Sequence, residues 1–203
     1  MRKEFLQFDT VRDNAIKLAH KIYSEGFIPD VIYVAMRGGA PLGNVISEYF
    51  KVVLKREHPV YYATVVARSY SGVATAGEIK MEGWSYPPER LRIGDKVLLA
   101  DDIFDSGNTI NHLARLIMDR GISRDHLKIA VHDYKYFTDK EKQHPVQPDY
   151  FCRRHDLSVH DEPYWIHYMS HELAGLTWEE AQKHYHPDLH EALKLATGGG
   201  QSS

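Results

Sequence analysis

Two kinds of hydrophobic pattern alternate along the chain and predict strands that alternate with helices. Apolar runs with strand propensity lie at residues 31–36, 60–67, 97–100 and 127–131. Between these runs apolar residues recur at helical spacing, as they do from Ile110 to Met118. Strands that alternate with helices form a parallel sheet with helices on both faces. We therefore expect an α/β fold with a central, mostly parallel, twisted sheet whose strand ends carry the ligand-binding loops.

The same patterns place helices near both ends of the chain. Thr10 is expected to cap a first helix that ends at Gly26, and Thr177 to cap a later one. A shorter helix is expected from Pro187 to Ala196. Residues 71–92 contain several glycines and prolines with little periodicity, which indicates a long loop of the kind that usually has a function.

Length and composition indicate one globular domain over residues 1–196, followed by a flexible, glycine-rich tail at 197–203. The net charge of -3 argues against nucleic acid as a partner. No stretch is apolar enough to span a membrane, and the N-terminal residues lack the apolar run of a signal peptide. Cys152 is the only cysteine, which favours a reducing compartment, so we expect a cytoplasmic protein.

Three carboxylates follow the apolar run at 97–100. Asp101 and Asp102 come directly after it, and Asp105 comes three residues later. Carboxylates suit hydroxyl donors, or a magnesium ion that is held partly through water. The alternative is a set of solvated acids at an ordinary strand end.

A small polar turn comes next, formed by Ser106, Gly107 and Asn108, and Thr109 is expected to cap the following helix. The backbone amides of this turn, together with the positive end of the helix dipole, suit a phosphate group. A second turn of this kind, Arg37-Gly38-Gly39, follows the strand at 31–36. Its glycines allow backbone amides and Arg37 to approach an anion closely.

Residues 97–109 resemble the phosphoribosyl-pyrophosphate loop of type I phosphoribosyltransferases: an apolar run, two acids, two apolar residues and a small polar turn that ends in Thr or Ser. Arg37-Gly38-Gly39 resembles the pyrophosphate loop of that family, in which the preceding peptide bond, here Met36–Arg37, can be cis. The resemblance covers most of residues 27–175 and is closest to enzymes that act on hypoxanthine, guanine or xanthine. It implies a core at roughly 27–135. It also implies a small hood formed by the N-terminus and roughly residues 136–175.

The resemblance implies transfer of a phosphoribosyl group from phosphoribosyl pyrophosphate to a 6-oxopurine, as in purine salvage, with Mg²⁺ as cofactor. Asp101 and Asp102 would hold the ribose hydroxyls, directly or through Mg²⁺, and Asp105 would be the general base. The pyrophosphate would lie against Arg37, Gly38 and Gly39. The 5-phosphate would lie against Ser106, Gly107, Asn108 and Thr109, although Asn108 stands where several purine enzymes have Lys or Gly.

At the base end, the resemblance assigns Lys135 to the 6-oxo group and Trp165, followed by Ile166, to stacking over the ring. Ser69 and Tyr70 resemble a pair on a mobile loop that closes over the site. The segment that ends in Glu172 departs from the usual Pro-Trp-acid form, which leaves open whether Glu172 helps to bind a second magnesium. Lys135 alone favours hypoxanthine as the first choice of base.

The resemblance also implies a homodimer or homotetramer, and it leaves two other functions open. A non-enzymatic regulator could use the same fold to sense phosphoribosyl pyrophosphate. A receiver-type signalling domain also uses acids at strand ends, but its acids come from separate strands, whereas these share one loop. The nearest histidine cluster, which comprises His184, His186 and His190, lacks cysteine partners, so we interpret it as a polar helix face and not as a zinc site.

Overall fold

The computed structural model describes residues 2–55, 59–69, 79–158 and 160–198, which form two compact units. The large unit consists of residues 9–161, and the small unit of residues 1–8 and 162–203.

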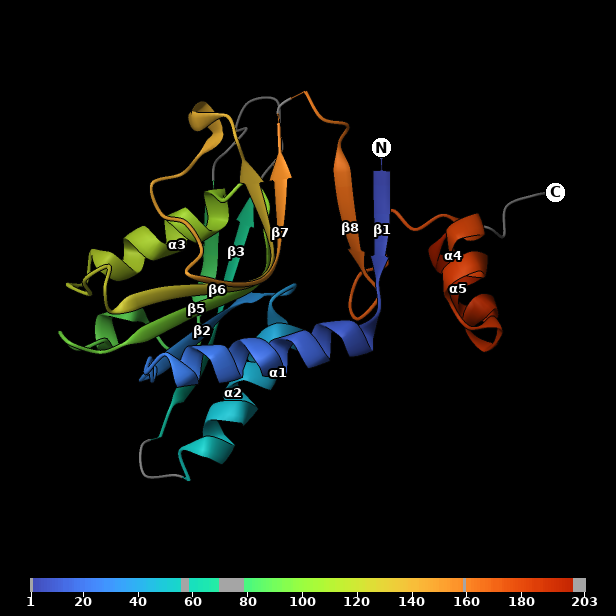
Figure 1. Cartoon of the computed structure of the whole chain (residues 1–203). Helices are drawn as coiled ribbons and strands as arrows, with labels where there is room; N and C mark the ends of the chain where they lie inside the picture. The colour runs from blue at the N-terminus through green and yellow to red at the C-terminus, as the bar shows by residue number, and fades with distance from the viewer. Residues whose placement is uncertain (1, 56–58, 70–78, 159, 199–203) are drawn as a thin grey trace. The chain divides into compact units, whose positions relative to one another are not determined.

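A six-stranded sheet forms the centre of the large unit (Figure 1). Its strand order is β4-β3-β2-β5-β6-β7, and every neighbouring pair is parallel except β3 and β4. The strands are β2 (Val31–Met36), β3 (Tyr61–Ser69), β4 (Ile79–Trp84), β5 (Val97–Phe104), β6 (Leu127–Phe137) and β7 (Tyr150–Leu157). This confirms the expected α/β fold with a mostly parallel central sheet.

Helices cover both faces of this sheet. On one face α1 (Phe8–Ser24) and α2 (Ala40–Val53) bury apolar stripes against alternate residues of β2, β5 and β6. On the other face α3 (Asn108–Met118) packs against the residues in between. Two short 3-10 turns, η1 (Pro88–Arg90) and η2 (Lys140–Lys142), lie in the connections. The strands are therefore buried from both sides, as their continuous apolar runs predict.

The small unit pairs the N-terminal strand with a strand from the far end of the chain. Strands β1 (Arg2–Leu6) and β8 (Tyr164–Tyr168) form a parallel two-stranded sheet. Two helices, α4 (Trp178–His184) and α5 (His190–Ala196), follow β8, with the 3-10 turn η3 (Pro187–Leu189) between them. Thr177 caps α4 as expected, in a capping box with Glu180.

Several element boundaries differ from the sequence-based predictions. Helix α1 begins at Phe8, so Thr10 lies inside it, and α3 begins at Asn108 with Gly107, not Thr109, as its N-cap residue. The segment expected to be one long loop contains β4 and η1. Residues 70–78 of that segment, which include Tyr70, and residues 199–203 of the expected tail lie outside the described residues.

Two strands also extend further than their apolar runs. β5 continues through both aspartates to Phe104, and β6 continues through Lys135 to Phe137. The two strands pair along this extension, where Ile103 lies opposite Asp133, because a neighbouring strand offers ladder partners that local propensity does not reveal. β7, expected in the hood, is instead the sixth strand of the large sheet. Cys152 lies in β7, and burial raises the pKa of its thiol to about 12.

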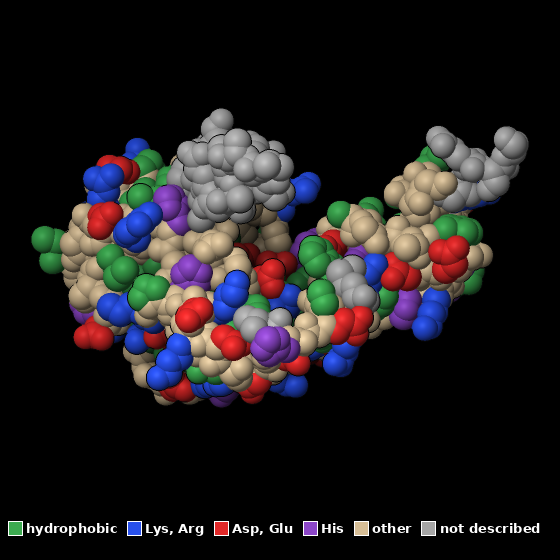
Figure 2. All heavy atoms as spheres, turned by 90° about the horizontal axis from the view of Figure 1, so that it is seen from above, with side chains coloured by type: hydrophobic (Ala, Val, Ile, Leu, Met, Phe, Trp, Pro, Cys, Tyr) green, Lys and Arg blue, Asp and Glu red, His purple; other side chains and the backbone are tan. Residues whose placement is uncertain are grey.

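The surface in Figure 2 carries acidic and basic side chains interspersed over the face in view. In the part of the chain that the structure describes, no helix has the length and apolarity needed to cross a membrane.

Candidate active site

Two neighbouring carboxylates, Asp101 and Asp102, lie in the last half of β5, where its apolar run has ended. The Asp102 amide donates to Asp101 Oδ1 at 2.9 Å, and the Ile103 amide donates to Asp102 Oδ1 at 3.0 Å. Burial raises the pKa of the Asp101 carboxyl well above its usual range, and the neighbouring Asp102 carboxylate raises it further. The pair therefore favours a bound cation or hydroxyl donors that offset its crowded negative charge.

The Arg37-Gly38-Gly39 turn lies directly against these carboxylates. A Cβ atom on Gly38 would lie 2.5 Å from both carboxylate oxygens of Asp102. One on Gly39 would lie 2.9 Å from the Asp101 Cα, so both positions need glycine for this close approach. The Met36–Arg37 peptide bond is cis, as expected, and the Arg37 side chain is exposed. The fold thus brings together two motifs that lie about sixty residues apart in the sequence.

The second predicted anion site is the turn between β5 and α3. Gly107 adopts a left-handed conformation, with φ +79°, and a side chain there would collide with the Phe104 ring. The Ser106 hydroxyl accepts from the Asn108 amide at 3.5 Å. Because the first amides of a helix lack intrahelical partners, this turn can bind a phosphate.

Asn111, which the sequence reading did not single out, fastens this turn to the connection between β6 and β7. Its Nδ2 donates to the carbonyls of Gly107, at 3.1 Å, and Val146, at 2.9 Å. The Val146 amide donates back to Asn111 Oδ1 at 3.0 Å. An amide side chain in the first turn of an amphipathic helix, a feature that Asn111 shares with Asn108, is the only sequence signal that points to this role.

Lys135 and Asp105 form an ion pair in which Nζ lies 2.6 Å from Oδ1. The Lys135 side chain is only 8% exposed, whereas that of Asp105 is 58% exposed. A nearly buried ammonium is thus paired with a carboxylate that reaches solvent. The predicted base-binding residue and the predicted general base therefore lie in direct contact.

The remaining predicted residues belong to the small unit or to β3. Trp165 is 42% exposed on β8 of the small unit, and the next residue, Ile166, is buried. Glu172 belongs to the same unit, where its Oε2 accepts from the Tyr168 amide at 3.2 Å. Ser69 is the last residue of β3, and the side chain is not among those described.

The carboxylates of β5 fit a magnesium ion. Among the described residues, no three His, Cys, Asp or Glu side chains are grouped so that they could hold a metal by themselves. Magnesium is usually bound by one or two carboxylates and takes its other ligands from water and substrate phosphates. Asp101 and Asp102, next to two predicted phosphate-binding turns, meet that description.

Comparison with known proteins relates this geometry to a family. A family model described as phosphoribosyl transferase domain matches residues 1–164, which is most of the chain. No curated protein sequence matches. Among solved structures, the chain is similar to a purine phosphoribosyltransferase from Pyrococcus horikoshii Ot3, at 22% identity and a TM-score of 0.60, over 85% of this chain and 96% of that one.

Two further solved structures share the fold. A hypothetical protein from Neisseria gonorrhoeae with bound ppGpp is 20% identical, with a TM-score of 0.61 over 96% of this chain and 97% of that one. The xanthine-guanine-hypoxanthine phosphoribosyltransferase of Helicobacter pylori is 18% identical, with a TM-score of 0.55 over 90% of this chain and 95% of that one. At these identities the likeness establishes the fold alone, whereas the family model covers the sequence itself. The chain therefore belongs to the phosphoribosyltransferase domain family, with the fold of its type I members.

Proposed function

We propose that this protein transfers the phosphoribosyl group of phosphoribosyl pyrophosphate to a 6-oxopurine base and releases pyrophosphate. The observation that carries the proposal is the contact of Gly38 and Gly39 with the acidic end of β5. This contact places an anion-binding turn beside carboxylates that can hold a sugar or a metal. Two structural relatives, a purine phosphoribosyltransferase and a xanthine-guanine-hypoxanthine phosphoribosyltransferase, support the choice of base.

Each part of the sugar pyrophosphate has a proposed partner in the large unit. Asp101 and Asp102 hold the ribose hydroxyls and the magnesium ion, and Arg37, Gly38 and Gly39 hold the pyrophosphate. The amides of residues 106–109 hold the 5-phosphate. Magnesium, when bound, neutralises charge on the leaving pyrophosphate.

The base has two proposed partners in the large unit. Lys135 donates to the 6-oxo group, and Asp105 accepts the proton from the attacking purine nitrogen. A contact of Trp165 and Ile166 with the purine ring stays a prediction. The role expected for Ser69 and Tyr70, of which Tyr70 lies outside the described residues, stays a prediction. Glu172 is a further candidate for holding a second magnesium. A core with a hood, a homodimeric or homotetrameric assembly and a cytoplasmic role in purine salvage complete the proposal.

A panel of bases tests this function. Purified protein is mixed with phosphoribosyl pyrophosphate, Mg²⁺ and either hypoxanthine, guanine, xanthine or adenine, and nucleotide formation is followed by spectrophotometry. We expect nucleotide from at least one 6-oxopurine and none after magnesium is chelated. Tight binding of phosphoribosyl pyrophosphate without product from any base would favour the second candidate, a non-enzymatic regulator that senses phosphoribosyl pyrophosphate. The N. gonorrhoeae relative with bound ppGpp is the observation that favours that candidate.

Loss of both carboxylates of β5 is expected to weaken binding of the sugar pyrophosphate. The Asp101→Asn/Asp102→Asn protein should bind phosphoribosyl pyrophosphate about 10- to 100-fold more weakly in calorimetry with Mg²⁺, because charge-assisted contacts are lost. The matched control, Asp119→Asn/Asp125→Asn, removes two exposed carboxylates from the same unit and should bind like the parent. Equal affinity for the two double variants would remove the β5 carboxylates from the proposed site.

A further inference from the structure

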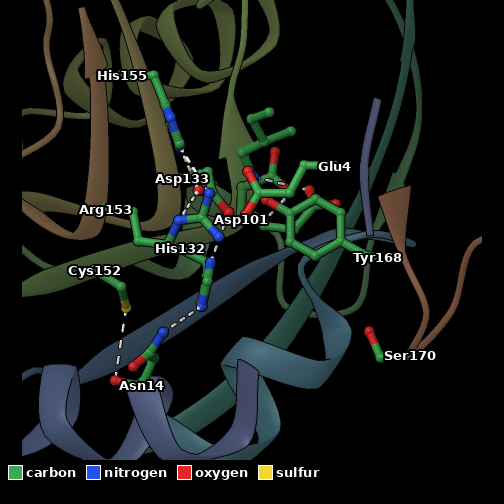
Figure 3. A network of polar contacts seen from close by, with 12 residues as sticks. Glu4, Asn14, Asp101, His132, Asp133, Cys152, Arg153, His155, Tyr168 and Ser170 are labelled. Carbon is green, nitrogen blue, oxygen red and sulfur yellow. Dashed lines mark hydrogen bonds and ion pairs between the residues drawn. The ribbon is translucent and has the colours of Figure 1, made fainter. Parts of the chain in front are cut away.

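A buried carboxylate outside the proposed reaction organises four other side chains near the end of β6 (Figure 3). Asp133 is completely buried, and its Oδ2 lies 2.7 Å from Nδ1 of His132, which is also completely buried. Its Oδ1 lies 2.7 Å from His155 Nε2 and 3.0 Å from Arg153 Nε, both on β7. On the far side, His132 Nε2 lies 3.1 Å from Nδ2 of Asn14 in α1.

These contacts hold the β7 side chains Arg153 and His155 in fixed positions. A buried charge is costly unless it is paired and hydrogen-bonded. The Asp133 carboxylate is paired with the Arg153 guanidinium and bonded to two imidazoles. The network becomes more exposed toward β7, where His155 is 15% and Arg153 is 23% exposed. Figure 3 shows both side chains directed at Asp133. Arg153 Nη2 also lies 3.4 Å from His155 Nε2. The guanidinium group is therefore held by a buried carboxylate and a neighbouring imidazole, and it is partly exposed.

Strand register places this guanidinium beside Lys135. In the β6–β7 ladder Asp133 pairs with Arg153, and Lys135 pairs with His155. Residues two apart on a strand lie on the same face, so Arg153 is the diagonal neighbour of Lys135. Arg153 pairs with Asp133, which lies on the neighbouring strand β6. Lys135 pairs with Asp105, which directly follows the neighbouring strand β5. Strands β6 and β7 thus carry two cations as diagonal neighbours, Lys135 and Arg153, and each cation is paired with a carboxylate.

We propose that Arg153, positioned by Asp133, is a specificity-determining residue that selects a purine with oxygen at position 2 as well as at position 6, namely xanthine. The inference rests on the proposed function and refines its substrate. A guanidinium group has donors only. It matches the 2-oxo group of xanthine, and the negative charge that xanthine acquires near neutral pH. Guanine instead presents an amino donor at position 2, and hypoxanthine a C–H, so neither can accept from Arg153.

The proposal changes the order of preference that follows from Lys135 alone. Lys135 can donate to the 6-oxo group of any 6-oxopurine. Hypoxanthine needs no further partner at position 2, so it is the first choice when Lys135 is considered alone. With a second fixed cation at the base end of the site, xanthine gains a charge-assisted contact that hypoxanthine lacks. We therefore expect the parent protein to use xanthine with a higher kcat/KM than hypoxanthine or guanine.

The test compares Arg153→Gln with the parent on xanthine and hypoxanthine under the same conditions. We expect kcat/KM for xanthine to fall by about 10- to 100-fold, mostly through KM, while kcat/KM for hypoxanthine hardly changes. The matched control is Arg154→Gln. Arg154 is the next residue on β7, is exposed and pairs with Asp156. The Arg154→Gln protein should keep the parent's ratio of kcat/KM for xanthine to kcat/KM for hypoxanthine.

Arg153→Gln removes the guanidinium partner of the buried Asp133 carboxylate, so a second variant, Asp133→Asn/Arg153→Gln, removes both charges together. We expect this double variant to retain hypoxanthine activity and to lose the xanthine preference. A parent that uses hypoxanthine as well as xanthine, or an Arg153→Gln protein with the parent's ratio, would overturn the role of Arg153 and leave the proposed reaction intact. Failure of every base to react would instead contradict the proposed reaction, and this inference with it.

Discussion

Replacement of Asp105 by asparagine is expected to lower kcat for nucleotide formation by roughly 10²–10⁴, the usual contribution of a general base. An amide cannot take the proton that the purine nitrogen must lose. The change also takes a carboxylate away from the Lys135 ammonium, which is only 8% exposed, so the melting temperature of the variant is measured together with kcat. Affinity for phosphoribosyl pyrophosphate should survive, which separates this variant from those at Asp101 and Asp102.

Steady-state kinetics with saturating substrates measure this effect, and calorimetry checks the binding. Asp119→Asn is a suitable control, because Asp119 is an exposed aspartate that directly follows α3, the helix whose other end lies beside Asp105. It should retain the parent's kcat. An Asp105→Asn protein as active as the parent would remove Asp105 from the role of general base.

The second large effect concerns the choice between oxo and amino purines. The Lys135 ammonium can donate to a 6-oxo group but offers no acceptor to the 6-amino group of adenine. Because the side chain is only 8% exposed, an amino group of adenine that faces it loses its contact with water and gains no acceptor in return. The parent should therefore use 6-oxopurines far better than adenine, and Lys135→Ala should reduce that ratio by at least about 100-fold.

Ratios of kcat/KM for hypoxanthine and adenine test this prediction. Trp165→Ala should weaken all bases to a similar extent, since every purine has a π face, and Lys140→Ala, at an exposed lysine, should change neither base. Lys135 and Asp105 are in contact, yet their effects are separable. The Asp105 variant changes kcat for every base, whereas the Lys135 variant changes the ratio between bases. A parent that uses adenine as readily as hypoxanthine would contradict the assignment of Lys135.

The sequence predicts local features of the fold more accurately than features that depend on neighbouring strands. Val31–Met36 is an uninterrupted apolar run, and β2 occupies those residues. The aspartates after residue 100 were expected in a loop, but β6 continues beside them and extends β5. Strand β4 was missed because its sequence, IKMEGW, has weak strand character and gains its ladder partner from β3. Non-local pairing decides such cases, and no short sequence window contains it.

The same distinction holds for the candidate site. Residues within one turn, such as Gly38 and Gly39, carry a recognisable local signal, and the structure places both against β5. The Asp133 network carries no such signal, because it joins β6 to β7 by strand register and reaches Asn14, which precedes His132 by 118 residues. Its members look like ordinary polar residues in the sequence. Only the folded arrangement shows that a buried carboxylate fixes Arg153 next to Lys135.

The hydrogen bonds of Asn111 connect the motion of two segments. The turn that is proposed to hold the 5-phosphate and the connection between β6 and β7 share one side chain, which bonds Gly107 on one side and Val146 on the other. A ligand that orders the turn therefore also lowers the conformational entropy of the connection. The hydrogen of the Val146 amide exchanges with solvent only when its bond to Asn111 opens. Hydrogen-exchange protection at Val146 therefore measures the stability of the turn between β5 and α3, although Val146 lies in another segment.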